Sequence, residues 1–231
     1  MVIFLANVKY ITMGITERKE REREQRYQAI IDAAETVFFR KGYETSTMDD
    51  VALDAELSKG TLYLYFTSKD ELHFAIMERG MKLLMELMER RLNIKKSGLE
   101  TLRELGLALV EFSNLHPDYF NALIFFQGRD VEQQKLQEAK VNDFMANRNS
   151  LTLLNETLKR GMTDGSVRTD IPILELSATL WAQMMGILVM YSAKQMVFNL
   201  HNISREQLVN SHLKLIHDAL EPIHMEGVKH E

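Results

Sequence analysis

The sequence predicts an all-α protein, built from a small N-terminal unit of three helices and a larger helical unit that follows it. Apolar residues recur at helical spacing along almost the whole chain, and no alternating run is long enough to predict a strand. The 231 residues include only 3 prolines and 11 glycines, which leaves few breaks in these helical runs. The composition, 45% hydrophobic and 26% charged, is typical of a compact globular protein.

Composition also excludes several kinds of site. No cysteine occurs, which excludes disulfides, thiolate zinc sites and cysteine nucleophiles and favours a reducing compartment. The 7 histidines form no HExxH motif, the carboxylates form no paired Glu-x-x-His pattern, and there is no glycine-rich phosphate loop. The sequence therefore predicts no catalytic residue, no metal ligand and no cofactor. Because the formal net charge is -5, any contact with nucleic acid must be local.

Two apolar segments, residues 1–14 and Leu176–Ala193, resemble targeting or membrane segments in part. The first has no basic residue before its apolar run and is interrupted by Lys9, so it fits a secretory signal poorly. Translation from Met13 would be an equally natural start. The second is uncharged, but polar residues dilute it and no second span exists to pair with it. We expect a buried helix there, and a cytoplasmic protein with no membrane partner.

The N-terminal third carries the start and stop signals of four consecutive helices. After a charged lead-in, an amphipathic helix ends at Gly42. Its inner face carries Ile30, Ile31, Ala34, Val37 and Phe38. We expect Ser46, with an acidic residue three positions on, to cap a short second helix. Ser58 is the expected cap of a third helix that runs to Phe66, and Ser68 that of a long fourth helix.

Two short helices joined by a tight turn and supported by a preceding helix form a helix-turn-helix, in which the second helix enters the major groove of DNA. Residues 58–66 would be that helix. Its first turn holds Lys59, Gly60 and Thr61. Lysine can donate to guanine, threonine can contact a thymine methyl, and glycine lets the backbone approach closely.

The residues from Leu62 to Lys69 are suited to two tasks, anchoring the third helix in the core and contacting DNA phosphates. Leu62 and Phe66 are expected in the core, which leaves Tyr63 and Tyr65 pointing outward with hydroxyls that can bond phosphates. Lys69 combines its charge with the exposed N–H groups of a helix N-terminus. Taken singly, these residues are half-buried tyrosines, solvated lysines and helix caps. Their order and spacing together favour DNA binding.

At these residues the sequence resembles the tetracycline-repressor-like (TetR-type) family of bacterial regulators. The resemblance lies in FFRKGYETSTMDDVALDAELSKGTLYLYFTSKDEL, from Phe38 to Leu72. It implies a homodimer that binds a palindromic double-stranded DNA operator, with a pocket for a small-molecule effector in the remainder. The expected DNA-binding residues are Thr47, Ser58, Lys59, Gly60, Thr61, Tyr63, Tyr65 and Lys69. Four acidic residues depart from a basic footprint: Asp49, Asp50, Asp54 and Glu56.

We divide the chain into an N-terminal arm (1–24), a helix-turn-helix DNA-binding domain (25–70), a helical effector-binding and dimerisation domain (71–225) and a C-terminal tail (226–231). In the third part, amphipathic segments are expected at 99–115, 117–127, 131–160, 172–198 and 204–220. Pro117 and Pro172 suit first helical turns, and Gly161 suits a helix C-terminus.

The last two of these segments are apolar over more surface than a small domain can bury. We therefore expect them to form the dimer interface, as the resemblance implies, and the alternative is the domain's own core. A group of aromatic and methionine residues before and within these segments is either core or the lining of a cavity for a small apolar effector. The candidate effector-binding residues are Phe112, His116, Tyr119, Phe120, Phe126, Phe144, Trp181 and Met185.

The sequence thus predicts a ligand-responsive transcriptional regulator, a repressor that a small apolar effector releases from its operator. Two alternatives remain open: a helical interaction protein that keeps the helix-turn-helix as a scaffold, and an enzyme with an unmarked site. Operator binding that falls steeply with salt would separate the regulator from both.

Overall fold

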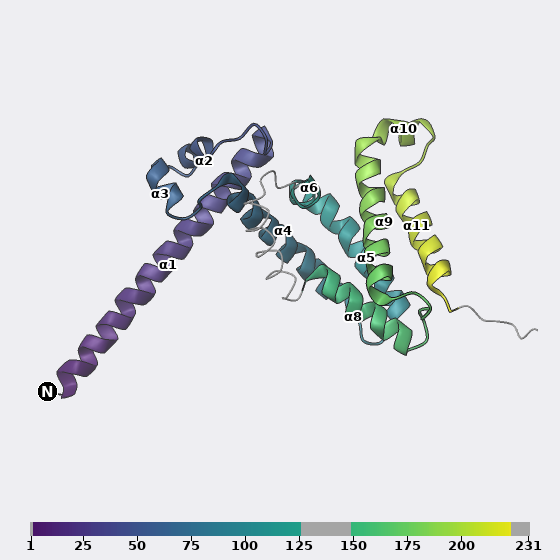
Figure 1. Ribbon diagram of the computed structural model, residues 1–231, viewed down its shortest axis with the longest axis horizontal. Coiled ribbons are helices and arrows are strands. Elements are labelled where there is room, and N and C mark those ends of the chain that lie inside the picture. Colours follow the sequence, from purple (N-terminus) through teal and green to yellow (C-terminus); the bar gives the residue numbers. More distant parts are fainter. Residues whose placement is uncertain (1, 126–148, 223–231) are drawn as a thin grey trace, which may run out of the picture. The chain divides into compact units, whose positions relative to one another are not determined.

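The computed structural model (Figure 1) describes the backbone of residues 2–125 and 149–222, and the side chains of residues 17–124 and 149–222. Within those ranges every regular element is a helix, so the predicted all-α class is confirmed. The chain divides into two compact units, Met1–Arg79 and Gly80–Glu231, which we call the N-terminal unit and the C-terminal unit. The predicted C-terminal tail lies outside the described residues.

The N-terminal unit consists of α1 (Val2–Lys41), α2 (Met48–Asp54), α3 (Lys59–Tyr63) and the first part of α4 (Lys69–Arg91), the helix in which the unit boundary lies. The predicted boundary at residue 24 falls inside α1. The inner face expected for α1 is buried, and Leu62 and Phe66 are 0% and 1% exposed. Both anchors are therefore confirmed, although α3 ends at Tyr63 and Phe66 lies just beyond the helix that was expected to include it. Gly42, with φ of +85°, ends α1 as expected.

Local capping differs from the sequence expectation at one position. Thr47, and not Ser46, caps α2: its side chain accepts the N–H of Asp50, whose carboxylate accepts the N–H of Thr47 in return. Ser46 is buried instead, and its hydroxyl donates to the carbonyl of Gly42 at 2.7 Å. The two hydroxyl residues are adjacent, so the spacing alone did not decide which one would point into the turn. Ser58 caps α3 as predicted.

The C-terminal unit contains α5 (Gly98–Leu115), α6 (Pro117–Phe125), α8 (Ser150–Thr163), α9 (Ile173–Ala193), α10 (Gln195–Leu200) and α11 (Arg205–Leu220). Helix α5 packs against α6, α8, α9 and α11, and α9 also lies beside α11 (Figure 1). Pro117 opens α6 as expected, whereas Pro172 lies one residue before α9 as its N-cap.

The crossing of α5 and α8 depends on two glycines. A Cβ placed on Gly98 would lie 2.1 Å from the Cα of Gly161, and one on Gly161 would lie 2.5 Å from Val167. The prediction that Gly161 ends its helix is wrong, because α8 continues to Thr163 and the turn glycine is Gly165, with φ of +75°. Gly161 is needed for the close approach of two helices rather than for a turn.

Residues 172–198, expected as one segment, form two helices, and the buried helix expected at Leu176–Ala193 is largely exposed in the single chain. Lys194, with φ of -125° and ψ of 26°, separates α9 from α10, and the ring of Phe198 turns back to stack on Tyr191 at 5.4 Å. Among the described helices α9 is the one with the length and composition of a membrane span, yet 22% of its most apolar window is buried in the chain. Helix α9 packs on α8, α11 and α5, and much of the rest of its surface is exposed.

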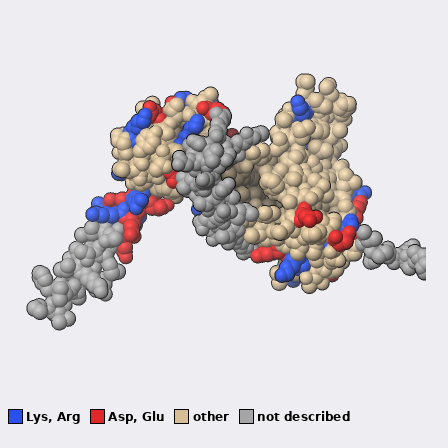
Figure 2. Space-filling view, in the orientation of Figure 1, with Lys and Arg blue, Asp and Glu red and all other residues tan. Residues whose placement is uncertain are grey.

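Large apolar side chains of α9, α10 and α11 are exposed to solvent. Figure 2 shows this side of the C-terminal unit as a largely uncharged surface. We call the exposed apolar residues of α9, α10 and α11 the α9–α11 face. It comprises Leu174, Trp181, Met190, Met196, Val197, Leu200 and Leu215, with exposures between 46% and 74%.

Candidate functional site

Helix α3 presents the expected recognition residues on the surface of the N-terminal unit. The hydroxyl of Ser58 accepts the N–H of Thr61 at 3.1 Å, which fixes the first turn. Lys59 and Gly60 are exposed, and the side chain of Tyr63 is 42% exposed. A Cβ added to Gly60 would meet nothing within 4 Å. The backbone of this turn is therefore open to another molecule.

Tyr65 is half-buried beside this surface, and two leucines that the sequence analysis left without a role lie exposed in the same unit. Leu53 of α2 is 81% exposed and Leu64, directly after α3, is 79% exposed. Apolar side chains can contact thymine methyl groups. Leu53 lies off the apolar period of α2 and Leu64 off that of the helix expected over residues 58–66, and that signal could have identified them.

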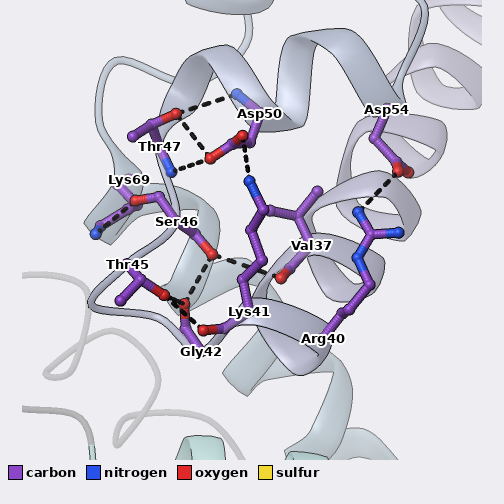
Figure 3. Close-up of polar contacts among 10 residues, drawn as sticks. All are labelled: Val37, Arg40, Lys41, Gly42, Thr45, Ser46, Thr47, Asp50, Asp54 and Lys69. Atoms are coloured by element: carbon purple, nitrogen blue, oxygen red, sulfur yellow. Dashed lines mark hydrogen bonds and ion pairs between the residues drawn. The ribbon is translucent and has the colours of Figure 1, made fainter.

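Three acidic residues near α3 are each paired with a basic residue, and Figure 3 shows two of these pairs, those of Asp50 and Asp54. The ion pairs are Lys59–Asp49 at 2.8 Å, Lys41–Asp50 at 2.5 Å and Arg40–Asp54 at 3.8 Å. Hydrogen bonds from Lys41 and then from Thr47 lower the pKa of Asp50 to about 2. These pairs offset much of the local negative charge.

Thr47 and Lys69, both expected at DNA, make contacts within the protein. The hydroxyl of Thr47 belongs to the capping box of α2. The ammonium of Lys69 donates to the carbonyls of Tyr43 at 2.7 Å and Ser46 at 3.0 Å, and lies 3.4 Å from that of Glu44. Figure 3 shows Lys69 directed at the loop that carries Ser46.

Tyr43, in the same loop as Ser46, is the centre of an aromatic and polar cluster. Its ring contacts those of Phe38 and His73 at centroid distances of 5.6 and 4.7 Å, and its hydroxyl donates to Asp70. Burial lowers the pKa of His73 to about 4, against a raising effect of Asp70. His73 is therefore neutral at physiological pH.

An apolar cavity lies within the C-terminal unit, between α4, α5, α8, α9 and α11. The centre of a water-sized sphere can move through about 90 Å³ of it. Leucine, methionine and isoleucine side chains make up most of the lining, including Leu84, Met88 and Leu105. The polar groups at its wall come from Arg103, His212 and His217 among others, and burial lowers the pKa of His212.

Of the eight residues expected to bind an effector, Trp181 lines this cavity. Phe112 and Phe120 are buried in the core, and His116 lies between the rings of Phe112 and Tyr119, at 5.6 and 6.1 Å. Met185 packs against the same core. Phe126 and Phe144 lie outside the described residues.

His212 and His217 were not predicted as lining residues, although the sequence of α11 carries a signal for them. These histidines and three aliphatic residues recur along one face of the helix: His212, Leu213, Ile216, His217 and Leu220. Polar residues on an otherwise apolar stripe are typical of a cavity wall that orients a ligand. Among the described residues, no group of three acidic, histidine or cysteine side chains could hold a metal ion.

Comparison with known proteins identifies the N-terminal unit. Residues 30–76 match the family described as bacterial regulatory proteins, tetR family. The fatty acid metabolism regulator protein of Bacillus subtilis is 26% identical over 154 residues, 66% of this chain and 76% of that protein. The transcriptional repressor KstR2 of Mycolicibacterium smegmatis is 25% identical over 150 residues, 64% and 70% of the two chains.

A solved structure shares the fold. The transcriptional regulator FadR from Bacillus subtilis, in complex with stearoyl-CoA, has a TM-score of 0.63 and 21% identity, and the match covers 84% of this chain and all of that one. The helix-turn-helix geometry, the match over residues 30–76 and this shared fold agree with one another. Residues 30–76 therefore form a domain of the tetR family of bacterial regulatory proteins, and the chain is similar over about two thirds of its length to a fatty acid metabolism regulator protein.

Proposed function

We propose that this protein is a ligand-responsive repressor that binds a palindromic DNA operator as a homodimer, with α3 in the major groove. One observation carries the proposal. Lys59, Gly60 and Tyr63 lie on the open side of α3, while Leu62 and Phe66 anchor the other side in the core. In this geometry the first turn of the second helix faces base edges.

The α9–α11 face supports a homodimer. Leu174, Met190 and Leu215 are 71%, 52% and 68% exposed, although soluble monomers seldom expose large contiguous apolar patches. A second copy of the same face would cover them in a two-fold symmetric interface. Such a dimer would hold two copies of α3, as two operator half-sites about 34 to 36 Å apart require.

The cavity of the C-terminal unit is consistent with an apolar effector. We propose that the apolar part of this effector is an acyl chain. The lining is largely aliphatic, and His212, His217 and Arg103 could orient a polar end group. A relative that is 26% identical is a regulator of fatty acid metabolism, and a protein of the same fold binds stearoyl-CoA.

Helix α4 is the proposed link between ligand and DNA. It carries Lys69 at its first residue and Leu84 and Met88 in the cavity wall. An effector releases DNA only to the extent that it binds the releasing conformation more tightly than the DNA-bound one. We expect an acyl ligand to lower operator affinity while the dimer stays intact, in a protein that acts in the cytoplasm.

The test combines three measurements on the whole chain. Binding to palindromic DNA from upstream of its gene is followed across a salt series, and we expect affinity to fall steeply as salt rises. Acyl-CoA and free fatty acids are then titrated while Trp181 fluorescence, operator binding and molecular mass are recorded together. Affinity that does not depend on salt would contradict the regulator. Quenching of Trp181 without loss of operator binding would contradict the coupling, and ligand-induced monomers would replace it with dissociation.

A further inference from the structure

One glycine of α5 lines the cavity of the C-terminal unit. Gly106 lies in the middle of the helix and is partly buried. Among the glycines of the described residues, a positive φ occurs at Gly42 and Gly165, so the backbone at Gly106 does not call for glycine. After proline, glycine is also the residue that least favours a helix interior. Its presence here therefore needs a reason in the packing.

The packing around Gly106 consists of side chains rather than backbone. A Cβ added there would lie 3.0 Å from Cδ2 of Leu213 and 3.2 Å from Cε of Met184. Both are the terminal atoms of side chains that line the cavity, and both residues are more than nine-tenths buried. Gly98 differs, because a Cβ there would lie 2.1 Å from a backbone atom of Gly161. At Gly106, two movable side chains occupy the space that a larger residue would fill.

We infer that Gly106 sets the width of the cavity, and with it the width of the acyl chain that the cavity accepts. Because position 106 carries no side chain, Leu213 of α11 and Met184 of α9 can lie back against the backbone of α5 and leave the interior open. An added methyl group would lie closer to both than the 3.4 to 4 Å of an ordinary contact. One or both side chains would then have to move, and the empty space beside them is the cavity. This inference rests on the proposed function, because it names the residue that selects the chain.

The test compares two glycine-to-alanine variants of the whole chain. Gly106→Ala adds a methyl group beside Leu213 and Met184. Gly186→Ala makes the same change on the exposed side of α9, where a Cβ would meet nothing within 4 Å. Since alanine favours a helix, the midpoint of thermal unfolding should change by no more than about 3 °C in either variant. A difference in ligand binding between them is then not a difference in folding.

Xenon measures the cavity without reference to any effector. It enters apolar cavities, and the methyl groups that line such a cavity respond to it in their NMR signals. In protein labelled at the methionine methyl groups, xenon pressure should shift the signals of Met88 and Met184 in the wild type and in Gly186→Ala. In Gly106→Ala we expect this shift to fall at least about threefold, because the displaced side chains take up the space.

Fatty acids measure the consequence for the ligand. Palmitic acid has a straight chain, whereas phytanic acid carries methyl branches along its length. We expect Gly106→Ala to bind palmitic acid about tenfold and phytanic acid about a hundredfold more weakly than the wild type does, because a narrower cavity excludes the wider chain more strongly. Leu213→Val, which removes the atom nearest to the new methyl group, should restore most of both losses when it is combined with Gly106→Ala.

Three results would each overturn the inference. Gly106→Ala could respond to xenon as the wild type does, it could lose equal affinity for the two fatty acids, or it could fail to fold because its neighbours cannot move. If xenon enters the wild type but neither fatty acid binds, the acyl effector of the proposed function fails. The xenon response of Gly106→Ala then still decides whether Gly106 sets the width of the cavity.

Discussion

The surface around α3 and the α9–α11 face differ in whether their side chains have partners within the same chain. Around α3, each of three acidic residues has a basic partner, and the loop carbonyls have the ammonium of Lys69. On the α9–α11 face, Leu174, Met196 and Leu200 are each more than 70% exposed. The first surface is completed by contacts within one unit. The second has the composition of a surface that a partner completes.

This difference predicts which property of the protein a substitution on each surface should change. A substitution around α3 alters contacts that already exist in the single chain, so its effect on stability and DNA binding can be estimated from those contacts. A substitution on the α9–α11 face alters an assembly, and its effect should appear only where a second copy is needed.

The largest effect is expected from charging the α9–α11 face. The double variant Leu174→Lys/Leu215→Lys places lysines where two copies would meet, so we expect a folded monomer. Loss of the second half-site contact should weaken operator binding on the order of a hundredfold. Light scattering and operator titration measure both. Ile94→Lys, which changes a 93% exposed residue outside the face, is the control and should remain a dimer. A dimeric double variant would show that the interface lies elsewhere.

Next in size is the cost of a methyl group at two glycines. Gly98→Ala puts a Cβ about where Gly161 already lies, so we expect the C-terminal unit to lose about 1–3 kcal/mol of unfolding free energy. Gly60→Ala meets nothing within 4 Å and should leave stability unchanged or slightly higher while weakening operator binding. Denaturant unfolding followed by Trp181 fluorescence reports on Gly98→Ala, and circular dichroism on Gly60→Ala. Equal destabilisation by both changes would contradict this account of the α5–α8 crossing.

His73 should make the N-terminal unit sensitive to acid. Its pKa is about 4 in the fold, below the ordinary value, so the unfolded state binds more protons and stability falls as pH falls. Between pH 7 and pH 5 the loss should be about 2 kcal/mol. Amide exchange at residues 72–76, measured between pH 7 and pH 5, reports the loss of stability in the N-terminal unit. His73→Phe should flatten the dependence, and an unchanged slope in that variant would assign the acid sensitivity to another group.

The smallest effect concerns Asp49, whose hydrogen bond raises the pKa of Lys59. The pair is exposed, with side chains 60% and 64% exposed, so it contributes little to stability. Asp49→Asn releases Lys59 and removes a negative charge from the DNA-facing surface. We expect non-specific DNA affinity at low salt to rise about threefold. Asp118→Asn, the same change on α6, should leave the DNA affinity unchanged. An equal increase in DNA affinity in both variants would show that Asp49 acts only through the net charge of the protein.

The same comparison explains what the sequence could predict. Around α3 the signals are local: the hydroxyl caps, the apolar anchors Leu62 and Phe66, and the turn at Gly42 each depend on neighbours within a few residues. The contacts of Lys69 were missed because they join residues more than twenty positions apart. In the C-terminal unit, Gly161 suits a helix end by its type alone. Its role at the α5–α8 crossing depends on Gly98, which no local pattern connects to it.

Most residues of the cavity lining were missed for a related reason, although a cavity with Trp181 in its wall was expected. The sequence prediction placed aromatic residues such as Phe112 and Phe120 in the cavity lining, but they are buried in the core. The cavity wall is made of leucine and methionine side chains from five helices, and such residues are indistinguishable from core in the sequence. Because α9 is apolar nearly all round, the sequence indicated surplus apolar surface there, but not which of its sides α5, α8 and α11 would cover.

The most direct test of the central claim, that α3 reads base edges, is a measurement of base preference. Operator affinity is determined for the wild type, Lys59→Ala and Thr61→Ala on a panel of operators that differ by one base pair each. We predict that each variant loses about 1–3 kcal/mol of discrimination at one or two positions of each half-site and keeps its preferences elsewhere. An equal loss on every operator, or a Lys59→Ala variant with affinity and base preference both unchanged, would contradict the placement of α3 in the major groove.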